Sequence, residues 1–108
     1  MPPFKPENRD NPITGIDRII HEPARYLIMA YLSVAESADA IFLQRQTALT
    51  WGNLSSHLRK LETAGYVAVK KEFIDRKPHT MLEMTPEGRE AFARYRIMMK
   101  HALEHLPE

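Results

Sequence analysis

The segment from Thr50 to Val69 constrains the fold of this chain more than any other part of the sequence. Leu54, Leu58 and Leu61 fall on one face when each residue advances about 100° around a helix. Short polar and cationic side chains fall on the opposite face, with Trp51 and His57 at the margins. Gly65 supplies the positive φ with which many helices end, and residues 66–69 are rich in strand formers. The segment therefore predicts an amphipathic helix over residues 50–64, followed directly by a β-strand.

The polar face of this helix carries residues that suit the major groove of DNA, where short polar side chains and cations meet base edges and phosphates. A solvated surface helix is the alternative for the helix taken alone. We expect Thr50 to cap the helix, which leaves the positive helix terminus open toward a phosphate. Gly52 either permits close approach of the backbone or is a neutral surface glycine. Trp51 is expected at the margin of the core rather than against a base.

A basic hairpin is predicted after the helix. Residues 70–74 continue the strand, the turn-forming and cationic residues 75–79 interrupt it, and residues 80–84 resume it. Between Arg45 and Met81 the chain carries seven Lys or Arg residues and three Asp or Glu residues, although the net charge of the whole chain is only +1. This excess is modest, but it lies where phosphate binding would need it.

These motifs together resemble the winged-helix transcriptional regulators of bacteria and archaea, in particular small single-domain proteins related to the MarR and ArsR repressors. The residues that carry the resemblance are 53–62, 64–67, Leu82 and 85–88, and the similarity extends from Ile16 to Leu106. The resemblance implies a mainly α fold with a small β-hairpin (α+β), namely a winged helix-turn-helix with a long C-terminal helix. It also implies that the helix over residues 50–64 reads DNA and that residues 74–80 form the wing.

The remaining helices are expected on both sides of this unit. Residues 1–13 form a Pro-rich arm, either a disordered tail or a segment that packs on a partner through Phe4, and residues 14–108 form the domain. A first helix is expected over residues 13–20. A second helix, starting at Pro23, should bury apolar side chains that recur at helical spacing. Asp39 should cap a third helix over residues 40–46. Residues 47–49 make the turn of the helix-turn-helix, with Leu49 beneath it. The expected inward-facing residues are Ile16, Ile19, Ile20, Tyr26, Leu27, Ala30, Tyr31, Val34, Phe42 and Leu43, with Met29 and Leu32 filling beside those of the second helix.

The C-terminal helix is predicted over residues 86–106, with Thr85 as its cap and Pro86 in its first turn. From Gly88 onward its apolar residues step alternately by four and three, which is a heptad spacing. We expect this edge to pair with a second copy of the chain, with docking against its own domain as the alternative. The expected interface residues are Phe92, Tyr95, Met99, Ala102 and Leu106.

Several other classes of protein are disfavoured. The chain has no cysteine, no apolar run near the roughly 18 residues of a membrane span, and no N-terminal signal sequence, so we expect a soluble cytoplasmic protein. His101 and His105 have the spacing of a metal-binding pair, but no further ligand cluster is evident, and a solvated helix end is the preferred interpretation. No phosphate loop, nucleophile elbow or acid–base pair appears. We therefore expect no enzymatic activity, no metal and no cofactor.

The sequence thus favours a homodimeric, sequence-specific regulator that binds double-stranded DNA at a palindromic operator. Arg59 is the best candidate for a guanine contact, and Arg76 and Lys77 for phosphate or minor-groove contacts at the wing tip, with His79 nearby. The alternative is a winged-helix module that binds another protein and leaves DNA to its partner. Relatives of the MarR type often bind small molecules, but no residue here identifies an effector. The expected DNA-binding residues are Thr50, Gly52, Asn53, Ser55, Ser56, Arg59, Lys60, Arg76, Lys77 and His79.

Overall fold

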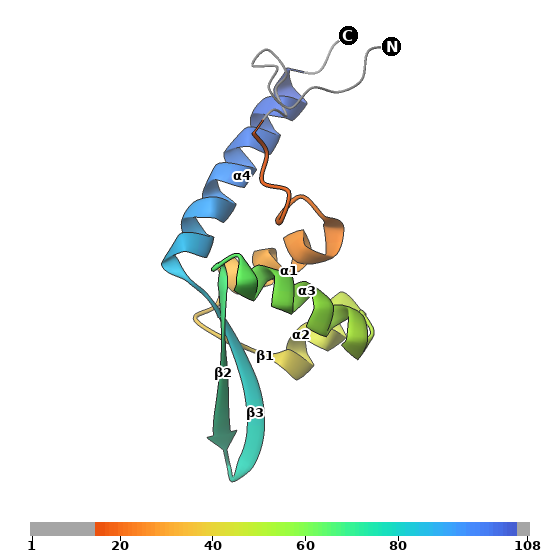
Figure 1. Cartoon of the computed structure of the whole chain (residues 1–108), viewed down its shortest axis with the longest axis vertical. Helices are drawn as coiled ribbons and strands as arrows, with labels where there is room; N and C mark the ends of the chain where they lie inside the picture. Colours follow the sequence, from red (N-terminus) through yellow and green to blue (C-terminus); the bar gives the residue numbers. More distant parts are fainter. Residues whose placement is uncertain (1–14, 106–108) are drawn as a thin grey trace.

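The computed structural model describes residues 15–105 of the 108-residue chain. These residues form four helices and a three-stranded antiparallel sheet, which confirms the predicted fold class of a mainly α domain with a small β-hairpin. Figure 1 shows the β2–β3 hairpin projecting from one end of the molecule, α4 running toward the other, and α1, α2 and α3 between them. The elements in chain order are α1 (Pro23–Ser33), β1 (Ala38–Asp39), α2 (Ala40–Thr47), α3 (Trp51–Thr63), β2 (Val67–Ile74), β3 (Lys77–Met84) and α4 (Pro86–Glu104).

The starts of α2 and α4 follow the predicted capping residues. The carboxylate of Asp39 accepts a hydrogen bond from the backbone N–H of Ile41 at 2.8 Å, so it caps α2. The hydroxyl of Thr85 does the same for α4 through the N–H of Gly88, at 2.9 Å. At the end of α3, Gly65 has the expected positive φ of 82°. These caps are local in sequence, which is why the pattern of single residues was enough to find them.

The first predicted helix, over residues 13–20, is wrong for the part that the structure describes. Residues 13 and 14 lie outside the described range, and residues 15–22 form turns instead of a helix. The side chain of Asp17 accepts hydrogen bonds from the backbone N–H groups of Ile19 and Ile20, which offers the backbone an alternative to helical pairing. Gly15 has a φ of +85°, which also lies outside the helical region. The apolar side chains of this segment nevertheless pack on the core.

The inward faces of α1 and α2 differ in part from the prediction. In α1, Met29 and Leu32 are buried as expected, but Arg25 and Ile28 are buried too, whereas Val34 is 85 % exposed and Tyr26 and Leu27 lie at the surface. This helix is apolar on most sides, so tertiary packing rather than periodicity selects its buried face. In α2, Leu43 is fully buried as expected, but Phe42 is exposed and its ring contacts Tyr31 edge-on at 5.9 Å between centroids.

The sheet contains one strand that the sequence did not predict. The short strand β1 pairs with β3 through Ala38 opposite Leu82 and Asp39 opposite Met81, which gives the order β1-β3-β2. The hairpin is also tighter than expected. Strand β3 begins at Lys77, so only Asp75 and Arg76 remain in the turn, and Pro78 and His79 are strand residues.

The hydrophobic core lies behind α3 and contains side chains from the other helices and from the sheet. Leu54 and Leu61 of α3 pack with fully buried residues of α1, α2 and β3, among them Ile28, Leu43 and Leu82. Leu58 is partly buried against the same cluster. The leucine face predicted for α3 is therefore its inner face, and the polar face is left at the surface.

Candidate nucleic-acid interface

The outer face of α3 presents the polar residues that the sequence singled out. Thr50 caps the helix, because its hydroxyl accepts a hydrogen bond from the N–H of Asn53 at 3.1 Å. The remaining predicted contact residues of this helix are all exposed: Gly52, Asn53, Ser55, Ser56, Arg59 and Lys60. A helix terminus with free N–H groups and a surface of short polar side chains suits both phosphate and base edges.

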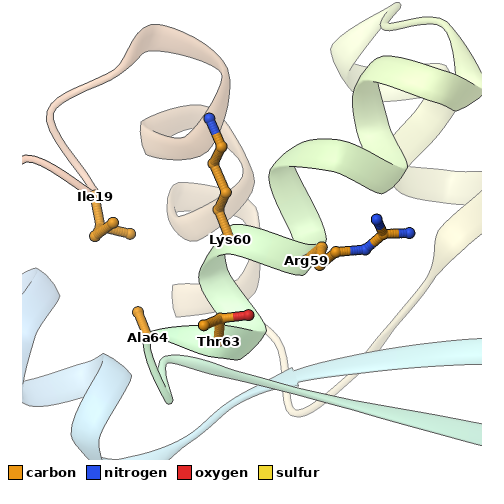
Figure 2. A pocket seen from close by; sticks show the side chains of 5 residues that line it. All are labelled: Ile19, Arg59, Lys60, Thr63 and Ala64. Atoms are coloured by element: carbon orange, nitrogen blue, oxygen red, sulfur yellow. The ribbon is translucent and has the colours of Figure 1, made fainter.

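The two cations of α3 point in different directions. Figure 2 shows Arg59 extending toward the side on which the hairpin runs, whereas Lys60 extends toward the segment that contains Ile19. Between them lies an open hollow of about 480 Å³, lined by Ile19, Arg59, Lys60, Thr63 and Ala64. Arg59 and the wing can therefore share one surface, but Lys60 stands apart from it and borders the hollow.

The wing tip is a two-residue turn with unusual backbone geometry. Asp75 and Arg76 both have positive φ values, 51° and 67°, which non-glycine residues seldom adopt. Arg76 and Lys77 are exposed. Among residues 15–105, neither of these cations nor Arg59 or Lys60 forms an ion pair. Their charge is thus not neutralised within this part of the chain.

His79 does not lie with the other predicted wing-tip residues. It is opposite Glu72 in the hairpin, and its Nδ1 lies 2.5 Å from a carboxylate oxygen of Asp39 at the start of α2. The N–H of Ile41, together with His79, holds the pKa of the Asp39 carboxyl below its usual value. His79 therefore joins the hairpin to the start of α2. Because its side chain is engaged with Asp39, we do not expect His79 to contact DNA with the wing-tip residues.

Trp51 differs from its prediction as well. Its side chain is 51 % exposed at the start of α3, instead of sheltered at the margin of the core. The first turn of α3 extends beyond the leucine-lined core, so nothing in the described chain covers the indole fully. The sequence pattern could not reveal this, because angular position on a helix does not say where the supporting core ends.

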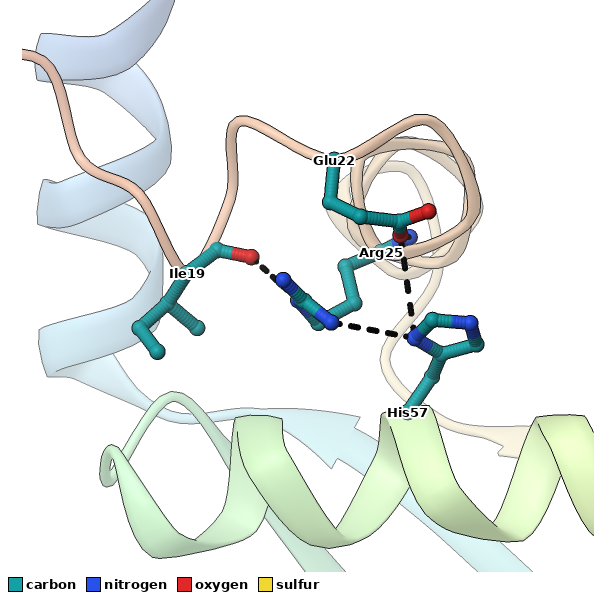
Figure 3. Close-up of polar contacts among 4 residues, drawn as sticks. All are labelled: Ile19, Glu22, Arg25 and His57. Atoms are coloured by element: carbon teal, nitrogen blue, oxygen red, sulfur yellow. Dashed lines mark hydrogen bonds and ion pairs between the residues drawn. The ribbon is translucent and has the colours of Figure 1, made fainter.

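Sequence reasoning did not identify Arg25, which lies behind α3. Figure 3 shows its guanidinium between the backbone carbonyl of Ile19 and the ring of His57, with the carboxylate of Glu22 beside the same ring. Arg25 is only 8 % exposed and is the one buried charged side chain in the described chain. Its signal in the sequence was a single cation within the apolar run of α1.

The heptad edge of α4 is largely covered by the chain itself. Phe92, Tyr95 and Ala102 are 5 %, 7 % and 5 % exposed, and Met99 packs against the core. The ring of Tyr26 lies 5.7 Å from that of Phe92 and 5.8 Å from that of Tyr95, between centroids. Leu106 lies outside the described residues. The alternative of docking within the chain therefore accounts for most of this edge, because the aromatic side chains of α1 meet it.

The described residues offer no cluster of three or more potential ligands that could hold a metal ion. His101 and His105 stack with their ring centroids 4.0 Å apart near the end of α4. No helix in residues 15–105 has the length and apolar character to cross a membrane.

Comparisons with known proteins agree with this geometry. Residues 24–103 match the family described as "Winged helix DNA-binding domain". An uncharacterized protein of Methanocaldococcus jannaschii is 37% identical over 78 residues, which is 72% of this chain and 85% of the relative.

Two solved structures have a similar fold. The first, a transcriptional regulator homologue from Pyrococcus horikoshii OT3, is 35% identical with a TM-score of 0.79 and covers 85% of this chain and 91% of its own. The second, a MarR-family transcriptional regulator from Silicibacter pomeroyi, is 21% identical with a TM-score of 0.63, covering 88% of this chain and 63% of its own. The chain therefore belongs to the winged-helix DNA-binding domain family, with MarR-like regulators among its structural neighbours.

Proposed function

We propose that this chain is a transcriptional regulator that binds double-stranded DNA sequence-specifically, with α3 in the major groove and the β2–β3 hairpin on the backbone or the adjacent minor groove. The observation that carries the proposal is that Arg59 and Arg76 are exposed and free of ion pairs among the described residues. Asn53 and Ser56 supply shorter polar groups along the same helix face. Arg59 pairs with a guanine edge, and Arg76 with phosphate or the minor groove.

Two arginine variants test this assignment on two duplexes. One duplex is selected from random DNA by the wild-type protein, and the other has the same composition in scrambled order. Arg59→Ala should lower the affinity for the selected duplex by about 1–3 kcal/mol and relax specificity. Arg76→Ala should weaken binding to both duplexes alike and lower the slope of log K against log salt by about one.

Arg94→Ala is the matched control, because Arg94 is exposed on α4 and paired with Glu90 at 2.8 Å. Its DNA affinity should equal that of the wild type. Unchanged binding by both Arg59→Ala and Arg76→Ala would mean that the surface is assigned wrongly. A wild-type protein that binds no DNA at low salt, but forms a salt-insensitive complex with another protein, would instead favour the interaction-module alternative.

The regulator acts as a homodimer in this proposal, which places two α3 helices about one DNA turn apart and matches a palindromic operator. Since its own domain covers most of the heptad edge, the support comes from a different side of α4. Ile97 is 68 % exposed and Leu103 is 64 % exposed there. Ala93 and Ile97 also border a surface hollow on this helix. Burial of these side chains by a second copy would remove apolar surface from water.

A small organic anion with an apolar body is the effector that the hollow between α3 and Ile19 suits best. Ile19 and Ala64 supply apolar surface, and Lys60 supplies positive charge (Figure 2). Salicylate is a suitable probe, and it should raise the melting temperature of the wild type but not of Lys60→Met. Equal shifts for both proteins would remove the hollow as the binding site.

A further inference from the structure

We propose that Arg25 is a positioning residue for DNA recognition, which fixes the orientation of α3 through a hydrogen bond to a neutral His57. The inference rests on the proposed function and deepens it. It concerns a residue that lies behind the reading helix and touches no DNA itself.

The contacts of Arg25 connect three segments of the chain. Its Nε donates a hydrogen bond to the carbonyl oxygen of Ile19 at 2.5 Å, and one of its terminal nitrogens donates to Nδ1 of His57 at 3.1 Å. Ile19 belongs to the turns before α1, Arg25 to α1 itself and His57 to α3 (Figure 3). The guanidinium thus joins the reading helix to the two segments packed behind it.

The donor chemistry of this contact defines the state of His57. A guanidinium has only donors, so the ring nitrogen that faces it must present a lone pair. The proposed contact therefore requires a neutral His57 with its proton on Nε2. The carboxylate of Glu22 lies 3.6 Å from the same Nδ1, beyond hydrogen-bond range, and instead accepts from the backbone N–H of Arg25 at 2.8 Å.

Glu22 balances the buried charge of Arg25. Partial burial raises the pKa of the Glu22 carboxyl, but backbone hydrogen bonds from Arg25 and Ala24, with the positive charge of Arg25, outweigh it and hold the pKa below its usual value. Glu22 is therefore ionised at neutral pH. A buried cation beside a fixed carboxylate is tolerable, whereas one that loses its hydrogen-bond partner is costly.

The directional contact matters because the contacts that hold the middle of α3 against the core are made by leucine side chains. Leu54, Leu58 and Leu61 hold the helix against the core, but hydrophobic contact has no preferred direction and tolerates small rotations. Base recognition needs its side chains within about 0.5 Å and 10–20° of the correct geometry. His57 lies two residues before Arg59. If the helix is held in place at His57, the backbone position from which the Arg59 side chain extends is held in place as well.

Three substitutions separate this role from simple stability. Arg25→Met keeps an unbranched chain but removes every donor. His57→Leu removes the acceptor, whereas His57→Asn keeps a carbonyl oxygen near the position of Nδ1. Arg94→Met is the control, since it removes a guanidinium from the surface of α4. Each protein is measured on the selected and scrambled duplexes over a range of salt concentrations, and the ring of His57 is observed by ¹⁵N NMR.

Arg25→Met and His57→Leu should lower the ratio of selected to scrambled affinity about tenfold, the scale expected when a buried hydrogen bond leaves one partner unpaired. Their salt slopes should remain unchanged because no phosphate contact is lost. His57→Asn and Arg94→Met should keep the ratio within about threefold of the wild type. In the wild type, NMR should show His57 neutral with its proton on Nε2, and Arg25→Met should lose this preference.

Each alternative outcome overturns a definite part of the account. A wild-type protein with no preference for any duplex overturns the proposed function, and the positioning role falls with it. A selective wild type whose ratio is unchanged in Arg25→Met overturns the positioning role alone. Should Arg25→Met fail to fold, the two His57 variants decide, and equal ratios for them contradict the inference. A His57 that is protonated, or carries its proton on Nδ1, contradicts it in every case.

Discussion

At the residue scale, two glycines, one in α4 and one in α3, have opposite roles. A Cβ at Gly88 would lie 2.2 Å from the backbone oxygen of Tyr66, so the first turn of α4 packs directly on the end of α3 and the start of β2. A Cβ at Gly52 would meet nothing within 4 Å. The first glycine therefore serves close packing within the chain, and the second has no structural reason to lack a side chain.

Alanine at these two positions should have opposite effects on stability. Gly88→Ala should lower the free energy of unfolding by about 1–3 kcal/mol, because backbone atoms must move to admit the methyl group. Gly52→Ala should raise it by about 0.5–1 kcal/mol through helix propensity. Denaturant unfolding of both variants measures the difference. A stabilising Gly88→Ala would mean that α4 does not approach Tyr66 this closely.

Tyr66 also forms a polar contact that fixes the end of α3. Its hydroxyl donates to Asp17 at 2.5 Å, and this hydrogen bond, with burial, raises the pKa of Tyr66 to about 12. A folded-state pKa above the unfolded value of about 10 stabilises the fold fully below pH 10, and the contribution is lost as pH rises through 12. The wild type should therefore lose stability over this interval.

Tyr66→Phe removes both the hydrogen bond and its pH dependence. We expect it to cost about 1–2 kcal/mol at neutral pH, the scale of a hydrogen bond to a charged group that is partly exposed. Thermal melts of both proteins from pH 8 to 12 check this. Parallel pH profiles would contradict a contact between Tyr66 and Asp17.

At the element scale, local signals were predictable from the sequence and long-range pairings were not. Asp39, Thr50, Thr85 and Gly65 act within a few residues of themselves, so their roles were visible in order along the chain. Strand β1 has only two residues, and it exists because β3 offers a free edge to it. The buried face of α1 likewise packs against α3 and β3, which are remote from it in the sequence.

The β2–β3 hairpin likewise combines features that were predictable from the sequence with a contact that was not. Its cations and strand-forming residues predicted a basic hairpin, but the register that places His79 against Asp39 depends on tertiary packing. The candidate interface was therefore predictable as the outer face of α3 with a basic turn. The supporting contacts behind it, those of Arg25 above all, needed the three-dimensional structure.

We expect Arg76 in the wing turn to lower the stability of the fold while its side chain contributes to DNA binding. Arg76 has a φ of 67°, a conformation that glycine adopts without strain. Arg76→Gly should therefore raise the free energy of unfolding by about 1 kcal/mol, while affinity for DNA falls as it does for Arg76→Ala. Denaturant unfolding and a DNA titration of the same preparation measure both effects. If Arg76→Gly bound DNA as tightly as the wild type, Arg76 would not be part of the DNA-contact surface.

At the scale of the whole molecule, α4 has a covered side and an uncovered side. Its aromatic residues close the core against α1, which leaves Ile97 and Leu103 as the exposed large apolar side chains of this helix. The helix edge with heptad spacing is therefore part of the domain core, and assembly depends on the outer surface of the same helix.

Substitution of that outer surface should separate assembly from folding. Ile97→Lys should convert the dimer to a monomer in sedimentation velocity experiments, with little change in the unfolding midpoint, because the side chain is exposed within one chain. Lys71→Met, on the hairpin, serves as a control that should stay dimeric. A monomeric wild type, or an Ile97→Lys protein that remains dimeric, would contradict this assembly.

The central claim is that the outer face of α3 and the wing turn together bind a DNA duplex. Titration of ¹⁵N-labelled wild-type protein with the selected duplex tests it directly, through changes in backbone amide shifts. We predict the largest changes over residues 50–60 and at residues 75–77, with smaller changes on the outer face of α4. Changes confined to α4, or a spectrum that the duplex leaves unaltered, would contradict the claim.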